Sequence, residues 1–282
     1  MADNGPEQLR EVAEQLVGEA ADFVRRRRVE IFGTGAGTAV RTKSSPTDPV
    51  TLADVETEQL VRDRLRQLRP GDPVLGEEGG GSASSGPAST GVVRWVVDPI
   101  DGTVNFLYGI PAYSVSLAAQ VDGVSVAGAV ADVAGGRIYS AARGLGAHLL
   151  EAGQRRRLRC SDVGELSMTL LSTGFGYSPT RRAAQADLLA QLLPMVRDVR
   201  RLGSAALDLC MVAAGRLDAH YEHGLNEWDW AAGALIAAEA GAVVVLPGTD
   251  DEGAGLLLAA APGVAGKLIE ALDRFGGLPP LP

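Results

Sequence analysis

The sequence is poor in several kinds of residue, and each shortage excludes a class of protein. It has 282 residues but only two cysteines, Cys160 and Cys210, which cannot form the disulfide framework of a small secreted domain. No uninterrupted apolar run approaches the roughly 20 residues that a membrane-spanning helix needs. The first residues, MADNGPEQ, lack the basic and apolar regions of a signal peptide, so we expect a cytoplasmic protein without a membrane partner.

Basic residues are outnumbered by acidic ones. The formal net charge is −9 at pH 7, which argues against nucleic acid as the main partner. Hydrophobic residues make up 46% of the chain, enough for a sizeable core. We therefore expect a globular protein folded as one large domain or as two lobes.

The most informative segment is WVVDPIDGTVNF at residues 95–106. Its apolar start is typical of a buried strand, which ends in two carboxylates, Asp98 and Asp101. Neighbouring carboxylates repel each other unless a proton or a cation lies between them, and magnesium prefers oxygen ligands. Gly102 allows a ligand to approach closely, and the N–H groups around Thr103 could bind phosphate. The alternative is a turn in which both acids only accept hydrogen bonds from the backbone.

Apolar periodicity predicts two helices near the N-terminus, at 6–28 and 51–68. The second is expected to begin near Thr47 or Asp48, to contain Asp54, and to bury a set of apolar side chains: Leu52, Val55, Leu60, Val61 and Leu65. Glycine turns break residues 113–150 into antiparallel hairpins. The second half alternates helices near 182–194, 204–214, 229–240 and 264–274 with strands near 169–173, 217–222, 243–246 and 255–260.

Four other segments match the motifs of one enzyme family in order. They are KSSPTDPVTLAD at 43–54, LGEEG at 75–79, GSAALDLCMVAAGRLDAHYE at 203–222 and WDWAAGALIAAEAG at 228–241. Together with 95–106, they resemble the inositol monophosphatase family over nearly the whole chain. The resemblance implies an α/β (α+β) fold, a layered αβαβα sandwich in a single domain, 1–282, and usually a homodimer. Lobe 6–155 would hold most metal ligands and an antiparallel sheet, and lobe 156–282 the substrate side.

The resemblance also assigns roles to individual residues. The implied metal ligands are the side chains of Glu77, Asp98, Asp101 and Asp229, the backbone carbonyl of Ile100 and, for an additional weaker metal, Glu78. Thr103 and Asp54 would position and deprotonate the attacking water, with Glu77 beside them. The implied substrate contacts are Gly102, Thr103, Gly203, Ser204, Ala205, Glu222, Asp229 and, from a loop beside the site, Lys43.

The reaction implied is hydrolysis of a phosphomonoester by a metal-activated water, without a phosphoenzyme. Two to three Mg²⁺ ions per site are expected, with Li⁺ as an inhibitor. The expected substrate is a small phosphorylated polyol, inositol 1-phosphate; fructose 1,6-bisphosphate, histidinol phosphate and 3′-phosphoadenosine 5′-phosphate are alternatives. A different hypothesis is a regulatory binding protein that keeps the fold, although buried carboxylates are costly to retain without a cation.

Four further patterns suggest sites but favour simpler interpretations. Arg25 to Arg28 would be a solvated basic end of the first helix. The stretch GTGAGTA at 33–39 lacks the full GxGxxG and is typical of a loop. In HYEH at 220–223, a strand would direct the two histidines to opposite faces, which argues against zinc. Trp228 and Trp230 are expected mainly to pack, although they could border a substrate pocket.

Overall fold

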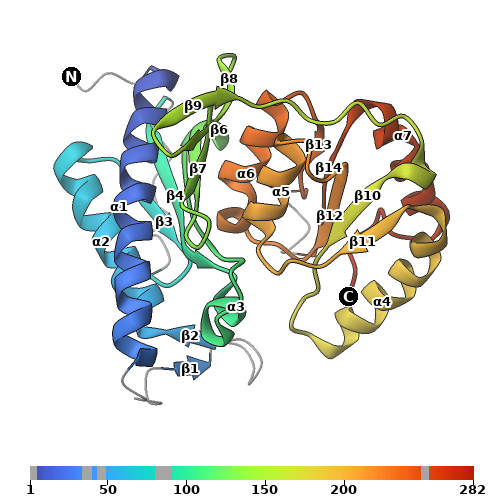
Figure 1. Ribbon diagram of the computed structural model, residues 1–282, viewed down its shortest axis with the longest axis horizontal. Coiled ribbons are helices and arrows are strands. Elements are labelled where there is room, and N and C mark those ends of the chain that lie inside the picture. The colour runs from blue at the N-terminus through green and yellow to red at the C-terminus, as the bar shows by residue number, and fades with distance from the viewer. Residues whose placement is uncertain (1–4, 34–39, 43–48, 80–90, 249–253) are drawn as a thin grey trace.

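The computed structural model describes residues 5–33, 40–42, 49–79, 91–248 and 254–282 (Figure 1). The helices in these ranges are α1 (Pro6–Gly33), α2 (Leu52–Leu68), α3 (Thr103–Tyr108), α4 (Pro179–Leu192), α5 (Ala205–Ala213), α6 (Glu227–Glu239) and α7 (Pro262–Arg274). A seven-stranded sheet contains β3 (Val74–Gly76), β4 (Val93–Asp101), β5 (Ser114–Val121), β6 (Val124–Asp132), β7 (Arg137–Ala142), β8 (Gly146–Glu151) and β9 (Gln154–Arg157). A five-stranded sheet contains β10 (Leu170–Thr173), β11 (Asp198–Arg200), β12 (Ala219–His223), β13 (Val243–Val245) and β14 (Leu256–Ala260), while β1 (Val40–Thr42) pairs with β2 (Pro49–Thr51).

The two large sheets alternate with three layers of helices (Figure 1). Helices α1 and α2 cover the outer face of the seven-stranded sheet, α5 and α6 lie between the sheets, and α4 and α7 cover the outer face of the five-stranded sheet. This arrangement is the αβαβα sandwich that the sequence predicts. None of the helices in the described ranges is both long and apolar enough to cross a bilayer.

The seven-stranded sheet is buried on both faces, which explains its apolar strands. Trp95 and Val97 of β4 pack toward α1 and α2, whereas Val96 between them packs toward α5 and α6. Its strands follow one another in antiparallel order, as the predicted hairpins require, except that β3 runs parallel to β4. The C-terminal end of β4 therefore enters a region that helices enclose on both sides.

The five-stranded sheet is mixed, and its central strand β12 faces two ways. β10 is parallel to β11 and β12, and β14 is antiparallel to β12 and β13. Ala219 and Tyr221 pack into the outer core beside α4 and α7. His220 and Glu222 alternate with them and so face the inner side of the sheet.

The predicted helices and strands of the second half are confirmed with small shifts at their ends. The helix predicted at 51–68 is confirmed as α2, but the end of the first helix and the residue expected near the start of the second are wrong. Helix α1 continues to Gly33, and Arg27 pairs with Glu56 of α2 at 2.6 Å. Helix α2 is capped by Thr51, whose hydroxyl accepts from the N–H groups of its first turn.

The predicted buried side of α2 is also partly wrong. Leu52 and Val55 are 47% and 49% exposed, whereas Val61 and Leu65 are buried. The first turns of α2 bury Ala53, Asp54 and Thr57 instead, so the apolar residues there lie on the outer side. The predicted loop at 33–39 lies outside the described residues except for Gly33.

Candidate active site

The end of β4 brings two predicted ligands to one cavity. On a regular strand, residues three apart face opposite sides of the sheet. The register of β4 against β5 shifts between Asp98 and Asp101, however, and both side chains line the same cavity. Glu77, directly after β3, and Asp229, in the first turn of α6, also line it. Four predicted carboxylates thus come together from segments far apart in the sequence.

The cavity has a volume of about 1240 Å³ and extends well beyond these acids. Its acidic end also includes the predicted residues Ile100, Gly102 and Thr103. Its far end is formed by the loop at 174–178, the start of α4, Arg201 and the end of β12, whereas the segment at 203–205 reaches Asp101 through Ser204. The predicted contacts Gly203, Ser204, Ala205 and Glu222 all line the cavity. The structure therefore places the predicted metal side and substrate side in one space.

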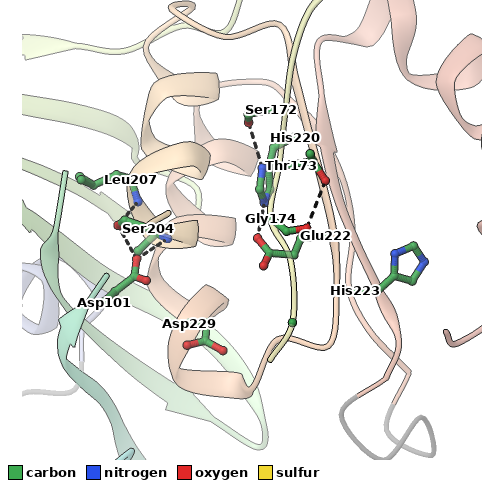
Figure 2. A network of polar contacts seen from close by, with 12 residues as sticks. Asp101, Ser172, Thr173, Gly174, Ser204, Leu207, His220, Glu222, His223 and Asp229 are labelled. Atoms are coloured by element: carbon green, nitrogen blue, oxygen red, sulfur yellow. Dashed lines mark hydrogen bonds and ion pairs between the residues drawn. The ribbon is translucent and has the colours of Figure 1, made fainter. Parts of the chain in front are cut away.

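Asp101 is held in place by the start of α5 (Figure 2). Its Oδ2 accepts hydrogen bonds from Ser204 Oγ at 2.5 Å, from Ala206 N at 2.8 Å and from Ser114 Oγ at 3.4 Å. Ser204 also caps α5, because its Oγ accepts from the N–H of Leu207. Burial raises the pKa of Asp101 to about 6, against the opposing effect of the Ser204 hydrogen bond. Ser204 thus orients an acid as well as lining the substrate side.

Thr103 connects the cavity to the buried carboxylate of Asp54. Thr103 Oγ1 lies 3.0 Å from Asp54 Oδ1 and 3.0 Å from the carbonyl of Ile100, so it donates to one of them at a time. Thr51 donates to Asp54 Oδ2 from its N–H at 2.9 Å and its hydroxyl at 2.5 Å. Burial raises the pKa of Asp54 to about 6, with the Thr51 hydrogen bonds opposing it. A carboxylate with that pKa can accept a proton near neutral pH.

The acidic end carries more negative charge than the described residues neutralise. Burial, and then the charge of Glu77, raises the pKa of both Asp98 and Asp229 well above the ordinary value. Asp98 Oδ1 is buried and has no hydrogen-bond partner within the described ranges. Asp229 Oδ2 accepts from the N–H of Asn226 at 2.6 Å, which closes a capping box at the start of α6.

These residues fit a hard divalent cation by their donor chemistry. Buried carboxylates that raise one another's pKa favour a proton or a cation among them, and an unpartnered oxygen is available at Asp98. In the part of the chain that the structure describes, no group of three or more His, Cys, Asp or Glu side chains is close enough together to hold a metal ion by itself. Magnesium does not require such a group, because it commonly takes one or two carboxylates and completes its shell with water and phosphate oxygens.

Glu222 marks the substrate side of the cavity. Its carboxylate rests on Gly174, where a β-carbon would collide with it. Burial raises the pKa of Glu222 to about 8, and the positive charge of Arg201 opposes this shift. The side chain is therefore mostly protonated near pH 7 and can donate a hydrogen bond to a substrate hydroxyl as well as accept one.

The two histidines beside Glu222 face opposite ways, as predicted (Figure 2). His220 Nδ1 lies 2.9 Å from Ser172 Oγ, and its Nε2 lies 3.6 Å from Glu222 Oε2. His223 points away from them, and its Nε2 lies 2.9 Å from the carbonyl of Gly277. The strand geometry therefore separates the ligands that a zinc site would need.

Three predicted residues are not among those that line the cavity: Glu78, Lys43 and Asp54, which contacts it through Thr103. Glu78 is half-buried outside the lining, and its N–H donates to Glu58 Oε2 at 2.8 Å. Lys43 lies outside the described residues. The roles of Glu78 and Lys43 remain predictions.

The sequence reasoning missed several residues at the site. Asn105, within the 95–106 motif, donates from Nδ2 to the carbonyls of Ala112 at 2.7 Å and Leu202 at 2.8 Å, so it joins the two sides of the cavity. Trp228 lines the cavity, while Trp230 packs into the core. Arginines at the far end were also missed, and the adjacent pairs at 181–182 and 200–201 were the available signal.

Cys210 and Arg216 have the C-x5-R spacing of cysteine phosphatases, a match that the sequence reasoning overlooked. Cys210 is fully buried within α5, however, and burial raises the pKa of its thiol well above the ordinary value. A buried, protonated thiol is a poor nucleophile. The spacing therefore does not mark a second catalytic centre.

Comparison with known proteins agrees with this geometry. A sequence model of the inositol monophosphatase family matches residues 6–275. The chain belongs to the inositol monophosphatase family. It is 67% identical over 285 residues to an inositol-1-monophosphatase of Mycobacterium leprae, covering 99% of this chain and 98% of the relative. Family membership at this similarity makes the protein a phosphatase.

A structure and a more distant relative extend the comparison. The structure of Mycobacterium tuberculosis SuhB is 60% identical and has a TM-score of 0.83, covering 98% of this chain and 100% of that one. A protein of Pasteurella multocida named Nus factor SuhB is 38% identical over 239 residues, covering 82% of this chain and 85% of the relative. The relatives of this chain therefore include proteins named inositol-1-monophosphatase and others named Nus factor.

Proposed function

We propose that the protein is a Mg²⁺-dependent phosphomonoesterase that hydrolyses inositol 1-phosphate to inositol and phosphate. The observation that carries the proposal is the single cavity that joins four carboxylates to the segment at 203–205 and Glu222. The relatives named inositol-1-monophosphatase support the choice of substrate. Fructose 1,6-bisphosphate, histidinol phosphate and 3′-phosphoadenosine 5′-phosphate are the alternatives within the same chemistry.

The cation would be held by the carboxylates of the acidic end and by the backbone carbonyl of Ile100, with Glu78 beside an additional weaker ion. Magnesium bound there lowers the pKa of a water and offsets the charge of the phosphate. Thr103 orients the attacking water, and Asp54 takes the proton through the hydroxyl contact at 3.0 Å. Li⁺ would inhibit by competing for this end.

The polyol is recognised by lining residues of the cavity other than the metal ligands. Gly203 and Ala205 leave space next to the acids, and Ser204 keeps Asp101 oriented while it lines the alcohol side. The mostly protonated carboxyl group of Glu222 exchanges hydrogen bonds with ring hydroxyls. Lys43 is proposed to approach from its loop.

The proposed unit of function is the whole chain, with lobe 6–155 supplying most metal ligands and lobe 156–282 supplying the alcohol contacts and Asp229. We further propose a cytoplasmic homodimer. Size-exclusion chromatography with light scattering would test the dimer, since a monomer at micromolar concentration would contradict it.

The activity is tested by phosphate release from the four esters, with and without Mg²⁺ and Li⁺, beside Asp101→Asn. Mg²⁺-dependent turnover led by inositol 1-phosphate, lost in the variant and inhibited by Li⁺, is the expected result. Folded wild-type protein that is inactive on every ester would overturn the proposal.

A second candidate, a regulatory role in transcription, is favoured by the relative named Nus factor SuhB. Binding to transcription components that survives Asp101→Asn would support it. Loss of binding in a folded Asp101→Asn protein would tie any such role to the active site.

A further inference from the structure

A row of buried polar side chains leads from Glu222 into the layer between the two large sheets (Figure 2). His220 and Glu222 lie two residues apart on β12 and face the same side of the sheet, and Ser172 of β10 is the parallel partner of His220. Asp208 of α5 joins the row as a hydrogen-bond partner of Ser172. The hydrolysis described above uses only the end of this row, Glu222.

The row lies in otherwise apolar surroundings. Three of its members are at most 1% exposed: Ser172, Asp208 and His220. Opposite His220 and Glu222, strand β14 contributes the buried apolar side chains of Ala259 and Leu257. Polar groups in such surroundings cost free energy unless they are hydrogen-bonded. Nevertheless, Nε2 of His220 has no hydrogen-bond partner among the described residues, and it faces Oε2 of Glu222 at 3.6 Å.

The imidazole of His220 gives this row a direction. Burial lowers the pKa of His220 to about 3, so the ring is neutral near pH 7 and carries one N–H and one lone pair. Nδ1, 2.9 Å from Ser172 Oγ, and Nε2 therefore take opposite roles. If Nδ1 donates, Ser172 donates in turn to Asp208, and Nε2 accepts the hydrogen of a protonated Glu222. If Nδ1 accepts, every bond is reversed, and Nε2–H donates to the Glu222 carboxylate.

Both arrangements leave Glu222 in the same role toward the cavity. In each of them Oε2 is occupied by His220, and the other oxygen, Oε1, carries no hydrogen and only accepts. A protonated carboxyl group without such a partner could instead turn its O–H toward the cavity and donate. The imidazole thus removes the choice between donating and accepting.

We propose that His220, held by Ser172, is a positioning residue that fixes Glu222 as a hydrogen-bond acceptor, so that the cavity selects an alcohol with a hydroxyl donor at that point. The inference rests on the proposed function, because it takes Glu222 as a contact of the alcohol portion. Fluorine in place of that hydroxyl has a similar size but cannot donate. It would leave the oxygen of Glu222 without a hydrogen bond, and the loss of one bond is expected to weaken binding.

The test uses inositol 1-phosphate and analogues in which one ring hydroxyl at a time is replaced by fluorine. Values of kcat and KM are measured with Mg²⁺, and Glu222→Ala identifies the hydroxyl that faces Glu222, because fluorine at that position no longer matters in this variant. In the wild type, fluorine there should lower kcat/KM by about tenfold, mainly through KM. In His220→Leu the loss should shrink to about threefold, because the released carboxyl group can turn its O–H toward the fluorine. Ser172→Ala should give an intermediate loss, and it carries the test if His220→Leu misfolds.

His223→Leu is the matched control. It removes the other buried histidine of β12, whose Nε2 lies 2.9 Å from the carbonyl of Gly277 and which does not line the cavity, so the fluorine effect should stay as in the wild type. A merely structural role of His220 would lower activity on all the esters equally and leave their ratio unchanged.

The inference and the proposed function fail in different ways. An unchanged ratio in His220→Leu and Ser172→Ala, or an equal change in His223→Leu, would overturn the inference. So would wild-type protein that hydrolyses inositol 1-phosphate but shows no fluorine effect that depends on Glu222, and the proposed function would then stand. Wild-type protein that hydrolyses none of the esters would overturn the proposed function and the inference with it.

Discussion

The two ends of the cavity are built in different ways. The acidic end takes its side chains from the end of β4, the residue after β3 and the first turns of helices, and Asp54, Asp98 and Asp101 are nearly inaccessible. The far end, where arginines line the cavity, takes its side chains from a helix start and a connecting segment, and these are half-buried or exposed. Fixed positions are needed where a bond breaks, whereas a recognition surface can tolerate movement. We therefore expect substitutions at the two ends to affect different measurements.

The largest effect is expected from Asp98→Asn. Phosphate release should fall by about 10³-fold, because the acidic end loses a charged ligand. The metal-free variant should nevertheless unfold at a higher temperature than the metal-free wild type, since an amide removes one of several buried like charges. Thermal unfolding in EDTA and in Mg²⁺ checks both statements. A variant less stable than the wild type in EDTA would mean that the acids are not mutually repulsive.

Thr103→Val should lower kcat by about 10²-fold while KM changes little, because the hydroxyl contact to Asp54 is lost without loss of volume. Thr103→Ser keeps the hydroxyl and should recover most of the activity. Steady-state kinetics on one ester is sufficient. A change confined to KM would place Thr103 with the recognition residues instead.

His220, beside Glu222 on β12, should make the free energy of unfolding depend on pH. Burial lowers its pKa from 6.5 to about 3, so the unfolded chain binds a proton that the folded protein excludes. This contribution is complete above pH 6.5 and is lost as the pH falls toward 3. Relative to His220→Gln, the wild type should lose about 2 kcal/mol between pH 6.5 and pH 5. Urea unfolding of both proteins at the two pH values measures it, and a constant difference would contradict it.

Glu222→Gln should have the smallest effect, raising KM for inositol 1-phosphate by about tenfold with kcat nearly unchanged. The amide preserves the size and part of the hydrogen bonding of a protonated carboxyl group. Glu222→Ala, which leaves the space against Gly174 empty, should raise KM further. A loss of kcat in Glu222→Gln would show that the acidic end extends to this residue.

The acidic end was more predictable from sequence than the arginines of the far end, for a physical reason. Asp98 and Asp101 could be predicted from two carboxylates at the end of an apolar strand, and Asp229 from the resemblance to the last family motif; all three line the cavity. Arg201 follows a strand of three residues, β11, which is too short to show periodicity. The direction of its side chain depends on the space beside Gly203 and on the ring of Phe175. No local sequence pattern records these contacts.

The same limit explains the errors in the fold. Alternation and helical periodicity identified the hairpins at 113–150 and the later helices, because each has a long apolar pattern. They did not identify which turns of α2 have a neighbouring layer, so Leu52 and Val55 were assigned to the core although they are about half exposed. The capping box of Thr51 and Asp54 was visible in the sequence as T-x-x-D, but Thr47 or Asp48 was expected near the start of the helix instead.

Gly102 and Gly203 both line the cavity, and they approach each other through backbone atoms alone. Both have positive φ angles, 96° and 92°, and a β-carbon at Gly102 would lie 2.9 Å from the carbonyl oxygen of Ala112 and 3.0 Å from that of Gly203. Side-chain substitution there meets immediate steric resistance, whereas other lining residues such as Tyr177 and Arg182 are exposed. In a lineage descended from this fold, new substrates would be acquired by substitutions among the exposed lining residues. Gly102, Gly203 and the chemistry beside them would be inherited unchanged.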